Sequence, residues 1–359
     1  MPTDGRLVTL EYESKRLANN PLGDPHVRRF PVWLPPQYDR GNSRRFPVLY
    51  HLAPYTGSGW SLVNWRAFDE SIPERLSRLQ ATRRMGPTIV VFPDCFTSLG
   101  GNQYVNSSAI GRYADYLTKE LTRFVDGELR TLADRKHRGL FGKSSGGYAA
   151  LVHAMKYPQF WGAAASHAGD VGFETVYWPE WPAALTTLSA FRRPALREGK
   201  YRRPSAGTGQ RPGDDDGRVR HFLEHMRERS NPSGSEITAL MMVAMSATYD
   251  PSPSAPNGFR LPVNLETGVR IDSRWKRWLK HDPINLVREH AKALRQSRGL
   301  FLDCGWRDQY HIHYGSRRLS AELSKRNIEH RYEEFDGTHS GIDHRLDRSL
   351  PFLYRALKP

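Results

Sequence analysis

The chain has 359 residues, of which 38% are hydrophobic and 25% charged, and its formal net charge at pH 7 is +15. This length is enough for one large α/β domain or two medium ones, each with a sizeable core. The longest apolar run, Ala239–Ala247, falls far short of the roughly 20 residues that cross a bilayer, so the sequence excludes a membrane-spanning protein.

The N-terminal stretch MPTDGRLVTLEYES lacks the basic and apolar regions of a secretory signal, so we expect a cytoplasmic protein. The excess of Lys and Arg would suit binding to nucleic acid or to a membrane surface. Because the arginines are scattered and no nucleic-acid recognition module is present, we expect no specific nucleic-acid partner. A preference for anionic substrates stays open, and the sequence does not indicate an oligomeric state. Cys95 and Cys304 each follow an apolar run and are predicted to be buried, free thiols.

Along the chain, the first forty residues alternate apolar and polar positions and stop at Pro35-Pro36, which predicts an antiparallel pair of strands. Short β-rich runs then alternate with helical stretches. The predicted strands are Val48–Leu52, Thr88–Phe92, Arg138–Phe141, Ala163–Ser166, Leu300–Asp303 and Ile328–Phe335. The predicted helices are Tyr113–Leu129, Gly146–Lys156, Pro283–Arg295 and Gly315–Arg326. This alternation implies right-handed crossovers and an α/β fold with a mainly parallel central sheet and helices on both faces.

One segment, from about Phe173 to His281, breaks this alternation and is rich in Trp, Pro and Arg. Its middle, roughly residues 192–220, contains Arg-Arg-Pro twice and a run of three Asp, and we expect an exposed, mobile loop there. We therefore predict a single domain over residues 1–359, with a core formed by 1–172 and 282–359. Residues 173–281 form a cap-like insertion over the active site, and an inert surface elaboration is the alternative.

The stretch LFGKSSGGYAA, residues 140–150, contains the pattern G-x-S-x-G between a predicted strand and a predicted helix. In a nucleophile turn of this kind the serine has a strained backbone, and the flanking glycines leave room for the neighbouring strand and helix. The helix N-terminus behind it favours developing negative charge. Ser145 is out of register, because Lys143 stands where its first glycine would be. Ser144 is therefore the candidate nucleophile.

A serine hydroxyl needs a base that removes its proton, and the base needs an acid that orients it. Asp308 follows the predicted strand Leu300–Asp303, and His339 follows the predicted strand Ile328–Phe335. This gives the order Ser, Asp, His on loops after successive strands, which is the order of α/β hydrolases. The sequence thus predicts a catalytic triad of Ser144, Asp308 and His339.

Several other residues compete for these roles. His344 is a nearby alternative to His339, whereas Asp303 lies within a strand and is interpreted as structural. His311 and His313 form a close pair, but neither a cysteine nor a third ligand stands at standard metal-binding spacing. Since the chain also lacks a Gly-rich phosphate loop, we predict no metal and no organic cofactor.

The chain resembles the putative-esterase (esterase D-like) family of α/β hydrolases, which includes feruloyl esterases, enterochelin-type esterases, S-formylglutathione hydrolases and mycolyltransferases. The resemblance covers most of the chain except the loop near 192–220. It rests on the motifs VWLPPQYD, FPVLYHLAPYTGSGW, IVVFPDCF, HRGLFGKSSGGYAAL, LFLDCGWRDQY and FDGTHSGIDHR. It implies the α/β-hydrolase fold, with Ser144 as nucleophile, Asp308 as acid and His339 as base.

The resemblance also implies an oxyanion hole made of the backbone N–H groups of Tyr55 and Ser145. Similar esterases carry His-Gly before the loop that supplies the first donor, whereas this chain has Ala53-Pro54. Pro54 has no N–H to give. Losing one such donor costs on the order of 3–4 kcal/mol in the transition state, so this loop matters for activity.

The substrate is less clearly encoded. Aromatic and acidic residues in loops at the carboxyl ends of the strands or in the insertion are candidate substrate contacts, since ligands of open α/β sheets bind there. They are Trp60, Tyr104, Asp170, Trp178 and Trp181. An aromatic rim suits an aryl or acyl-sugar ester, although the same rings can simply pack the insertion onto the core.

We therefore expect a serine carboxylesterase acting on a small-molecule ester. Acyl transfer to a sugar or alcohol by the same site is one alternative, and it would be distinguished by comparing alcoholysis with hydrolysis of one activated ester. A catalytically idle binding protein of the same fold is another, and a fluorophosphonate probe would fail to label it.

Overall fold

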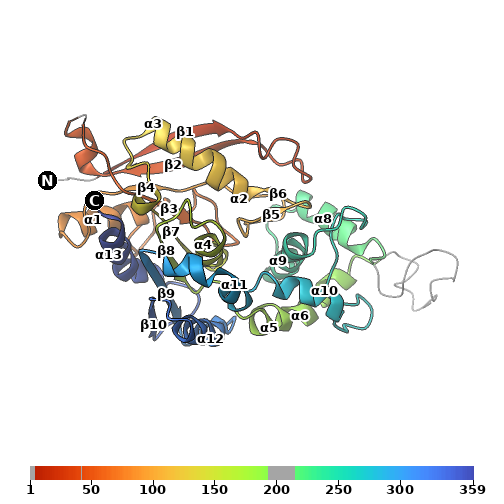
Figure 1. The fold of residues 1–359 in the computed structure, drawn as a ribbon. Coiled ribbons are helices and arrows are strands. Elements are labelled where there is room, and N and C mark those ends of the chain that lie inside the picture. The colour runs from red at the N-terminus through yellow and green to blue at the C-terminus, as the bar shows by residue number, and fades with distance from the viewer. Residues whose placement is uncertain (1–4, 42, 193–214) are drawn as a thin grey trace.

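The computed structural model describes residues 5–41, 43–192 and 215–359. At its centre lies an eight-stranded sheet with the strand order β1-β2-β4-β3-β7-β8-β9-β10 (Figure 1). The strands span Arg6–Glu13 (β1), Val27–Leu34 (β2), Val48–Leu52 (β3), Ile89–Val91 (β4), Arg138–Lys143 (β7), Ala163–His167 (β8), Gly299–Gly305 (β9) and Arg331–Phe335 (β10). A short ribbon of β5 (Asn106–Ser107) and β6 (Gly111–Arg112) forms a second sheet.

The direction of the strands follows the sequence prediction. β1 pairs antiparallel with β2, and β2 pairs antiparallel with β4. The pairs from β4 through β3, β7, β8 and β9 to β10 are all parallel. The predicted N-terminal antiparallel pair and the mainly parallel sheet are thus confirmed.

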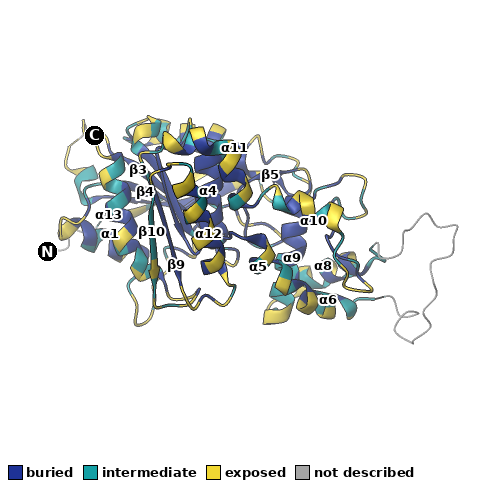
Figure 2. Cartoon of the chain, turned by 60° about the horizontal axis from the view of Figure 1, so that its bottom comes forward, coloured by how far each residue is buried: buried dark blue, intermediate teal, exposed yellow. Residues whose placement is uncertain are grey.

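Helices cover both faces of this sheet, and the central strands are buried between them (Figure 2). Because side chains of a strand alternate between faces, Leu49 packs with α1 (Ile72–Ala81) and α13 (Leu346–Leu357), whereas Tyr50 belongs to the core on the other face. That second face is covered by α2 (Tyr113–Asp115), α3 (Thr122–Glu128), α4 (Ser145–Lys156), α11 (Pro283–Arg295) and α12 (Ile312–Lys325), with a π-helical segment, Tyr116–Leu121, joining α2 to α3.

The segment predicted as an insertion is helical in its described part. It contains α5 (Phe173–Val176), α6 (Trp181–Ser189), α8 (Arg218–Glu228), α9 (Gly234–Tyr249) and α10 (Asp272–Leu279), which lie together beside the sheet (Figure 1). The two ends of the segment meet at Asp282, whose carboxylate accepts hydrogen bonds from the N–H groups of Gly172 (3.1 Å) and Phe173 (2.8 Å). The chain therefore leaves the core and returns to it at one point.

The loop predicted near residues 192–220 is described only in part. Residues 193–214 lie outside the described residues. The end of the predicted loop is corrected by the structure, because Arg218–Arg220 already belong to α8. The Arg218 side chain is buried and pairs with Asp216 and Glu266, which fixes the start of this helix.

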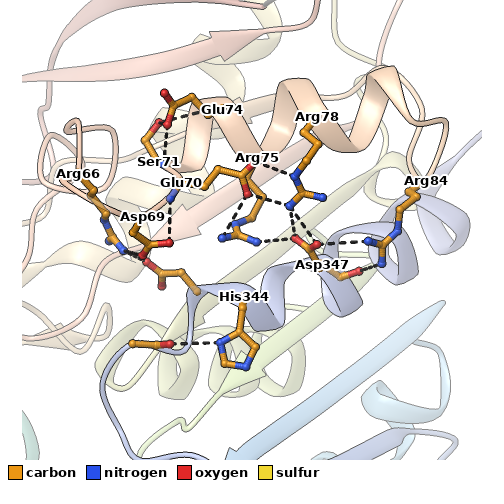
Figure 3. A network of polar contacts seen from close by, with 12 residues as sticks. Arg66, Asp69, Glu70, Ser71, Glu74, Arg75, Arg78, Arg84, His344 and Asp347 are labelled. Atoms are coloured by element: carbon orange, nitrogen blue, oxygen red, sulfur yellow. Dashed lines mark hydrogen bonds and ion pairs between the residues drawn. The ribbon is translucent and has the colours of Figure 1, made fainter.

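A network of ion pairs ties α13 to α1 and to the segment after α1 (Figure 3). Asp347 in the first turn of α13 accepts hydrogen bonds from Arg75 (2.6 Å), Arg78 (2.8 Å) and Arg84 (3.2 Å). Arg78 also pairs with both carboxylate oxygens of Glu70. Since α13 directly follows the loop that carries His339, this network fixes the far end of that loop.

Two further predictions concern thiols and membrane spans. Cys95 and Cys304 are free and buried, as predicted. Burial raises the pKa of the Cys304 thiol, so it stays protonated and is a poor nucleophile. Across the part of the chain that the structure describes, no helix combines the length and apolarity needed to cross a membrane.

Candidate active site

Ser144 occupies a sharp turn between β7, which ends at Lys143, and α4, which begins at Ser145. Its backbone has φ 55° and ψ −124°, a strained conformation that ordinary residues rarely adopt. The strand and helix approach so closely that a Cβ on Gly142 would lie 2.6 Å from the backbone of Gly146. The glycines of the G-x-S-x-G pattern are therefore required by space, as the sequence predicts.

The hydroxyl of Ser144 donates a hydrogen bond to Asp170 Oδ1 at 3.3 Å. Asp170 follows β8 and is buried, with Oδ2 accepting from the hydroxyl of Tyr177 (2.8 Å) and the amide of Gln103 (3.2 Å). Burial raises the pKa of Asp170, against the opposing effect of these donors and of His339. Asp170 thus lies beside the candidate nucleophile Ser144, as expected of a residue that faces the site.

Asp308 and His339 form a direct contact after β9 and β10. His339 Nδ1 lies 2.8 Å from Asp308 Oδ2, and both residues are buried. Burial alone would raise the pKa of Asp308, but the hydrogen bond from His339 and the backbone N–H of Tyr310 (2.9 Å) outweigh it, so the pKa lies below its usual range. An ionised Asp308 holds the ring with Nδ1 protonated, which leaves Nε2 free to accept a proton.

Ser144 and His339 line one cavity of about 190 Å³. Asp170 and Lys143 also line it. The remaining lining residues are Pro54, Tyr55, Thr56, Ser145, Val176, Tyr177, Ile237, Thr238, Met241, Gln309, Tyr310, Ile312 and Ser340. The wall of the cavity therefore combines polar groups from the core with apolar side chains from α5 and α9 of the insertion.

Tyr55 and Ser145, the residues predicted to form the oxyanion hole, both line this cavity. Hydrogen bonds from a neighbouring loop hold Tyr55 in place. The carbonyl of Tyr55 accepts from Gly101 N (2.6 Å), and the hydroxyl of Tyr55 donates to the carbonyl of Leu99 (2.7 Å). The backbone nitrogen of Tyr55 donates to no other described residue. The Ala53-Pro54 departure is thus accommodated by a loop that is held in place by residues 99–101.

Trp60 lies in a neighbouring groove and not in the cavity itself. This groove, of about 580 Å³, is lined by Trp60 and Phe96, both of which are partly exposed. The indole N–H of Trp60 donates to the carbonyl of Arg29 (2.9 Å), which fixes the ring. Thr56 lines both the groove and the cavity, so the two spaces are adjacent.

The three other aromatic candidates do not line the cavity. Tyr104 is buried and donates from its hydroxyl to the carbonyl of Ala53 (2.9 Å), so it supports the Tyr55 loop. Trp181 is buried and packs against Trp278, with ring centroids 6.0 Å apart. Trp178 packs against Trp275 at 5.6 Å. These two tryptophans therefore pack against other residues of the insertion and do not line the cavity.

Some residues that line the cavity were not singled out from the sequence as contacts. Lys143 lies inside the G-x-S-x-G motif, so its place beside the nucleophile could have been inferred from the motif itself. Gln103 is not itself a lining residue but donates to Ser145 Oγ (2.8 Å), and it belongs to SLGGNQYVNS, residues 98–107, a stretch whose sequence predicts a flexible pocket loop. Ile237 and Met241 belong to α9, whose position over the site depends on tertiary packing. Among the described residues, no cluster of His, Cys, Asp and Glu could hold a metal ion.

Comparison with known proteins finds similarity to esterases. A family model described as "Putative esterase" matches residues 25–347. Esterase Rv1288 of Mycobacterium tuberculosis is 29% identical over 196 residues, which cover 52% of this chain and 38% of that protein. S-formylglutathione hydrolase of Mus musculus is 29% identical over 138 residues, covering 36% of this chain and 47% of that protein. Each match thus spans less than half the length of the curated relative.

Solved structures agree over nearly the whole chain. A ferulic acid esterase superposes with a TM-score of 0.60 and 16% identity, covering 98% of this chain and 99% of the other. An S-formylglutathione hydrolase from Agrobacterium tumefaciens superposes with a TM-score of 0.57 and 16% identity, covering 99% and 97%. This likeness confirms the predicted α/β-hydrolase fold. The family match over residues 25–347 goes further, and the chain belongs to the putative esterase family.

Proposed function

We propose that the chain is a serine esterase that cleaves carboxylic esters through an acyl-enzyme on Ser144. The observation that carries this proposal is the placement of Ser144 and His339 at one cavity, with His339 held by Asp308 at 2.8 Å. The strained turn at Ser144 and the helix N-terminus behind it support the same role.

In the first half of the reaction, Ser144 Oγ rotates from Asp170 toward His339 and attacks the ester carbonyl, while His339 Nε2 takes its proton. Asp308 stabilises the imidazolium that forms. The N–H groups of Tyr55 and Ser145 donate to the oxyanion. His339 then returns the proton to the leaving alcohol oxygen as the ester bond breaks.

In the second half, a water molecule gives a proton to His339 and attacks the acyl-enzyme carbonyl. Collapse of this second tetrahedral intermediate releases the carboxylic acid and returns the proton to Ser144. The water must enter the cavity from the alcohol side, where the leaving group has just departed. The cycle needs no group beyond the three side chains and the two backbone donors.

For the substrate we propose an aryl or acyl-sugar ester. Val176, Ile237 and Met241 offer an apolar surface in the cavity, and the adjacent groove with Trp60 and Phe96 offers two aromatic rings. Aromatic faces bind planar rings and the apolar faces of sugars. A panel of aryl, short acyl-chain and sugar esters, ranked by kcat/KM, identifies the preferred class.

Acyl transfer is the second candidate, and the groove is the observation that favours it. Because Thr56 borders both spaces, an acceptor alcohol in the groove would lie near the acyl-enzyme. Product analysis of one activated ester in water and with an added alcohol or sugar distinguishes the two, since a transferase yields the new ester and an esterase the free acid.

The proposal is tested with 4-nitrophenyl acetate and variants of the three side chains. Ser144→Ala should lose on the order of 10⁴-fold or more in kcat/KM, and Asp308→Asn and His339→Gln should lose at least about 10³-fold. Ser235→Ala, at an exposed serine of α9, is the matched control and should behave as the wild type. Retained turnover in Ser144→Ala would exclude the proposed role.

A further inference from the structure

Lys143, a cationic residue directly before Ser144 in the chain, lines the cavity. It is the last residue of β7, which pairs with β3 on one side and β8 on the other, so its backbone is fixed within the sheet. Lys143 lines the same cavity as Ser144 and His339. Any substrate that reaches Ser144 therefore passes close to this residue.

The ammonium group of Lys143 forms no hydrogen bond or ion pair with another described residue. The charged groups that act on it are Asp343, Arg66 and Asp308. The carboxylate of Asp308 is bonded to His339, and that of Asp343 is paired with Arg66. Burial lowers the pKa of Lys143, which reflects the cost of holding a charge there without a partner of its own.

The charged neighbours of Lys143 also indicate which half of an ester would contact it. Asp308 lies in the loop after β9 and is hydrogen-bonded to His339, and Asp343 lies shortly after His339 in the chain. His339 must protonate the leaving oxygen, so the alcohol half of the ester lies on its side of Ser144. Asp170, by contrast, is hydrogen-bonded to Tyr177 and Gln103.

We propose that Lys143 binds a carboxylate on the alcohol half of the substrate. This inference rests on the proposed esterase function and adds a charge to the substrate class. One ammonium group matches the single charge of a carboxylate, whereas phosphate is ordinarily held by several cations or backbone N–H groups. The net charge of +15 adds long-range attraction for such an anion.

The test uses two acetate esters that differ in the charge of the leaving phenol, 4-acetoxybenzoate and 4-acetoxybenzamide. The quantity measured is the ratio of kcat/KM for the anionic to the neutral ester, which does not depend on the fraction of active enzyme. Lys143→Gln should lower this ratio about tenfold, and Lys143→Glu should lower it further. Lys143→Arg keeps the positive charge, so it should retain more of the preference for the anionic ester than either of these variants.

The control is Lys136→Gln, an exposed lysine whose loss changes the net charge equally and should leave the ratio unchanged. An unchanged ratio in Lys143→Gln and Lys143→Glu overturns the inference and leaves the esterase function intact. An equal fall in Lys136→Gln also overturns it, because long-range charge would then suffice. If the wild type cleaves neither ester, nor 4-nitrophenyl acetate, the esterase function fails, and the inference fails with it.

A second measurement needs no variant. The product 4-hydroxybenzoate should inhibit the wild type at least several-fold more strongly than 4-hydroxybenzamide when 4-nitrophenyl acetate is the substrate. This difference should shrink as the salt concentration rises, since the interaction is between charges. Equal inhibition by the two products contradicts a carboxylate site at Lys143.

Discussion

The hydroxyl of Ser144 points to Asp170, 3.3 Å from Oδ1, although the base predicted for this serine is His339. Both residues line the same cavity, and in the proposed mechanism the serine side chain rotates from one to the other. In that mechanism Asp170 holds the proposed nucleophile in a resting position, and its burial has consequences for stability.

Burial raises the pKa of Asp170, so its carboxylate costs stability at neutral pH. A carboxyl whose pKa is raised by folding costs no stability below its unfolded pKa of about 3.8, because it is protonated in both states. The cost grows as the pH rises from that value through the folded pKa, since the unfolded chain releases the proton first. Asp170→Asn keeps an acceptor for Tyr177 and removes the charge. Measured by urea unfolding, the variant should gain stability relative to the wild type between pH 4 and pH 7. A constant difference across this range would contradict the assignment.

A second prediction concerns Tyr104, whose hydroxyl donates to the carbonyl of Ala53 in the loop of the proposed oxyanion hole. Tyr104→Phe removes the hydrogen bond to the carbonyl of Ala53 and should lower kcat about tenfold, with a loss of about 1 kcal/mol in stability. Tyr116→Phe is the matched control, because the hydroxyl of Tyr116 is buried and has no partner among the described residues. Steady-state kinetics of the two variants should therefore differ, and an equal kcat would exclude the supporting role.

His153 in α4 gives a third prediction, on pH. Its ring is buried, with Nε2 2.7 Å from the carbonyl of Tyr104, and burial lowers its pKa to about 4. Because the unfolded chain takes up the proton at about 6.5, the free energy of unfolding should fall as the pH drops from 6.5 to 4, by on the order of 3 kcal/mol. His153→Gln cannot take up this proton and should lose less stability over the same range. If the free energy of unfolding falls by the same amount in both proteins between pH 6.5 and pH 4, the prediction is wrong.

The ion pairs of Asp347 give a fourth prediction. Asp347→Asn leaves the buried guanidinium of Arg75 with Glu70 as its remaining carboxylate partner and should cost about 2 kcal/mol in stability. Asp39→Asn breaks an exposed pair with Arg6 and should cost far less, because solvent screens it. Thermal unfolding of both variants makes the comparison. Similar melting temperatures would show that the network of Figure 3 adds little.

Much of the fold could be predicted from the sequence, because strands and helices alternate clearly in the core. The helix predicted over Pro283–Arg295 has these bounds in the structure, and the strand predicted over Val48–Leu52 does as well. Neither α1 nor α13 is among the helices predicted from the sequence, although both are amphipathic and α1 begins with a capping box of Ser71 and Glu74. Their ion pairs, such as that of Arg75 with Asp347, depend on residues distant in sequence and are visible only in the fold.

In the site, residues fixed by a motif were easier to predict than residues fixed by packing. Ser144, Asp308 and His339 stand at the ends of core strands, so the parallel sheet brings them to one edge. Gln103 and Met241 come from a loop and from the insertion, whose positions depend on contacts distant in sequence. Likewise, nothing local distinguishes Trp181, which is buried against Trp278, from Trp60, which is partly exposed in the groove.

Covalent labelling tests the central claim, that Ser144 is the nucleophile, most directly. The protein is treated with a fluorophosphonate and digested, and the modified peptide is located by mass spectrometry. We expect one adduct per chain, on Ser144, and no adduct in Ser144→Ala or in wild-type protein unfolded before treatment. An adduct on another serine, or a folded wild-type protein that stays unlabelled while it hydrolyses esters, would contradict the claim.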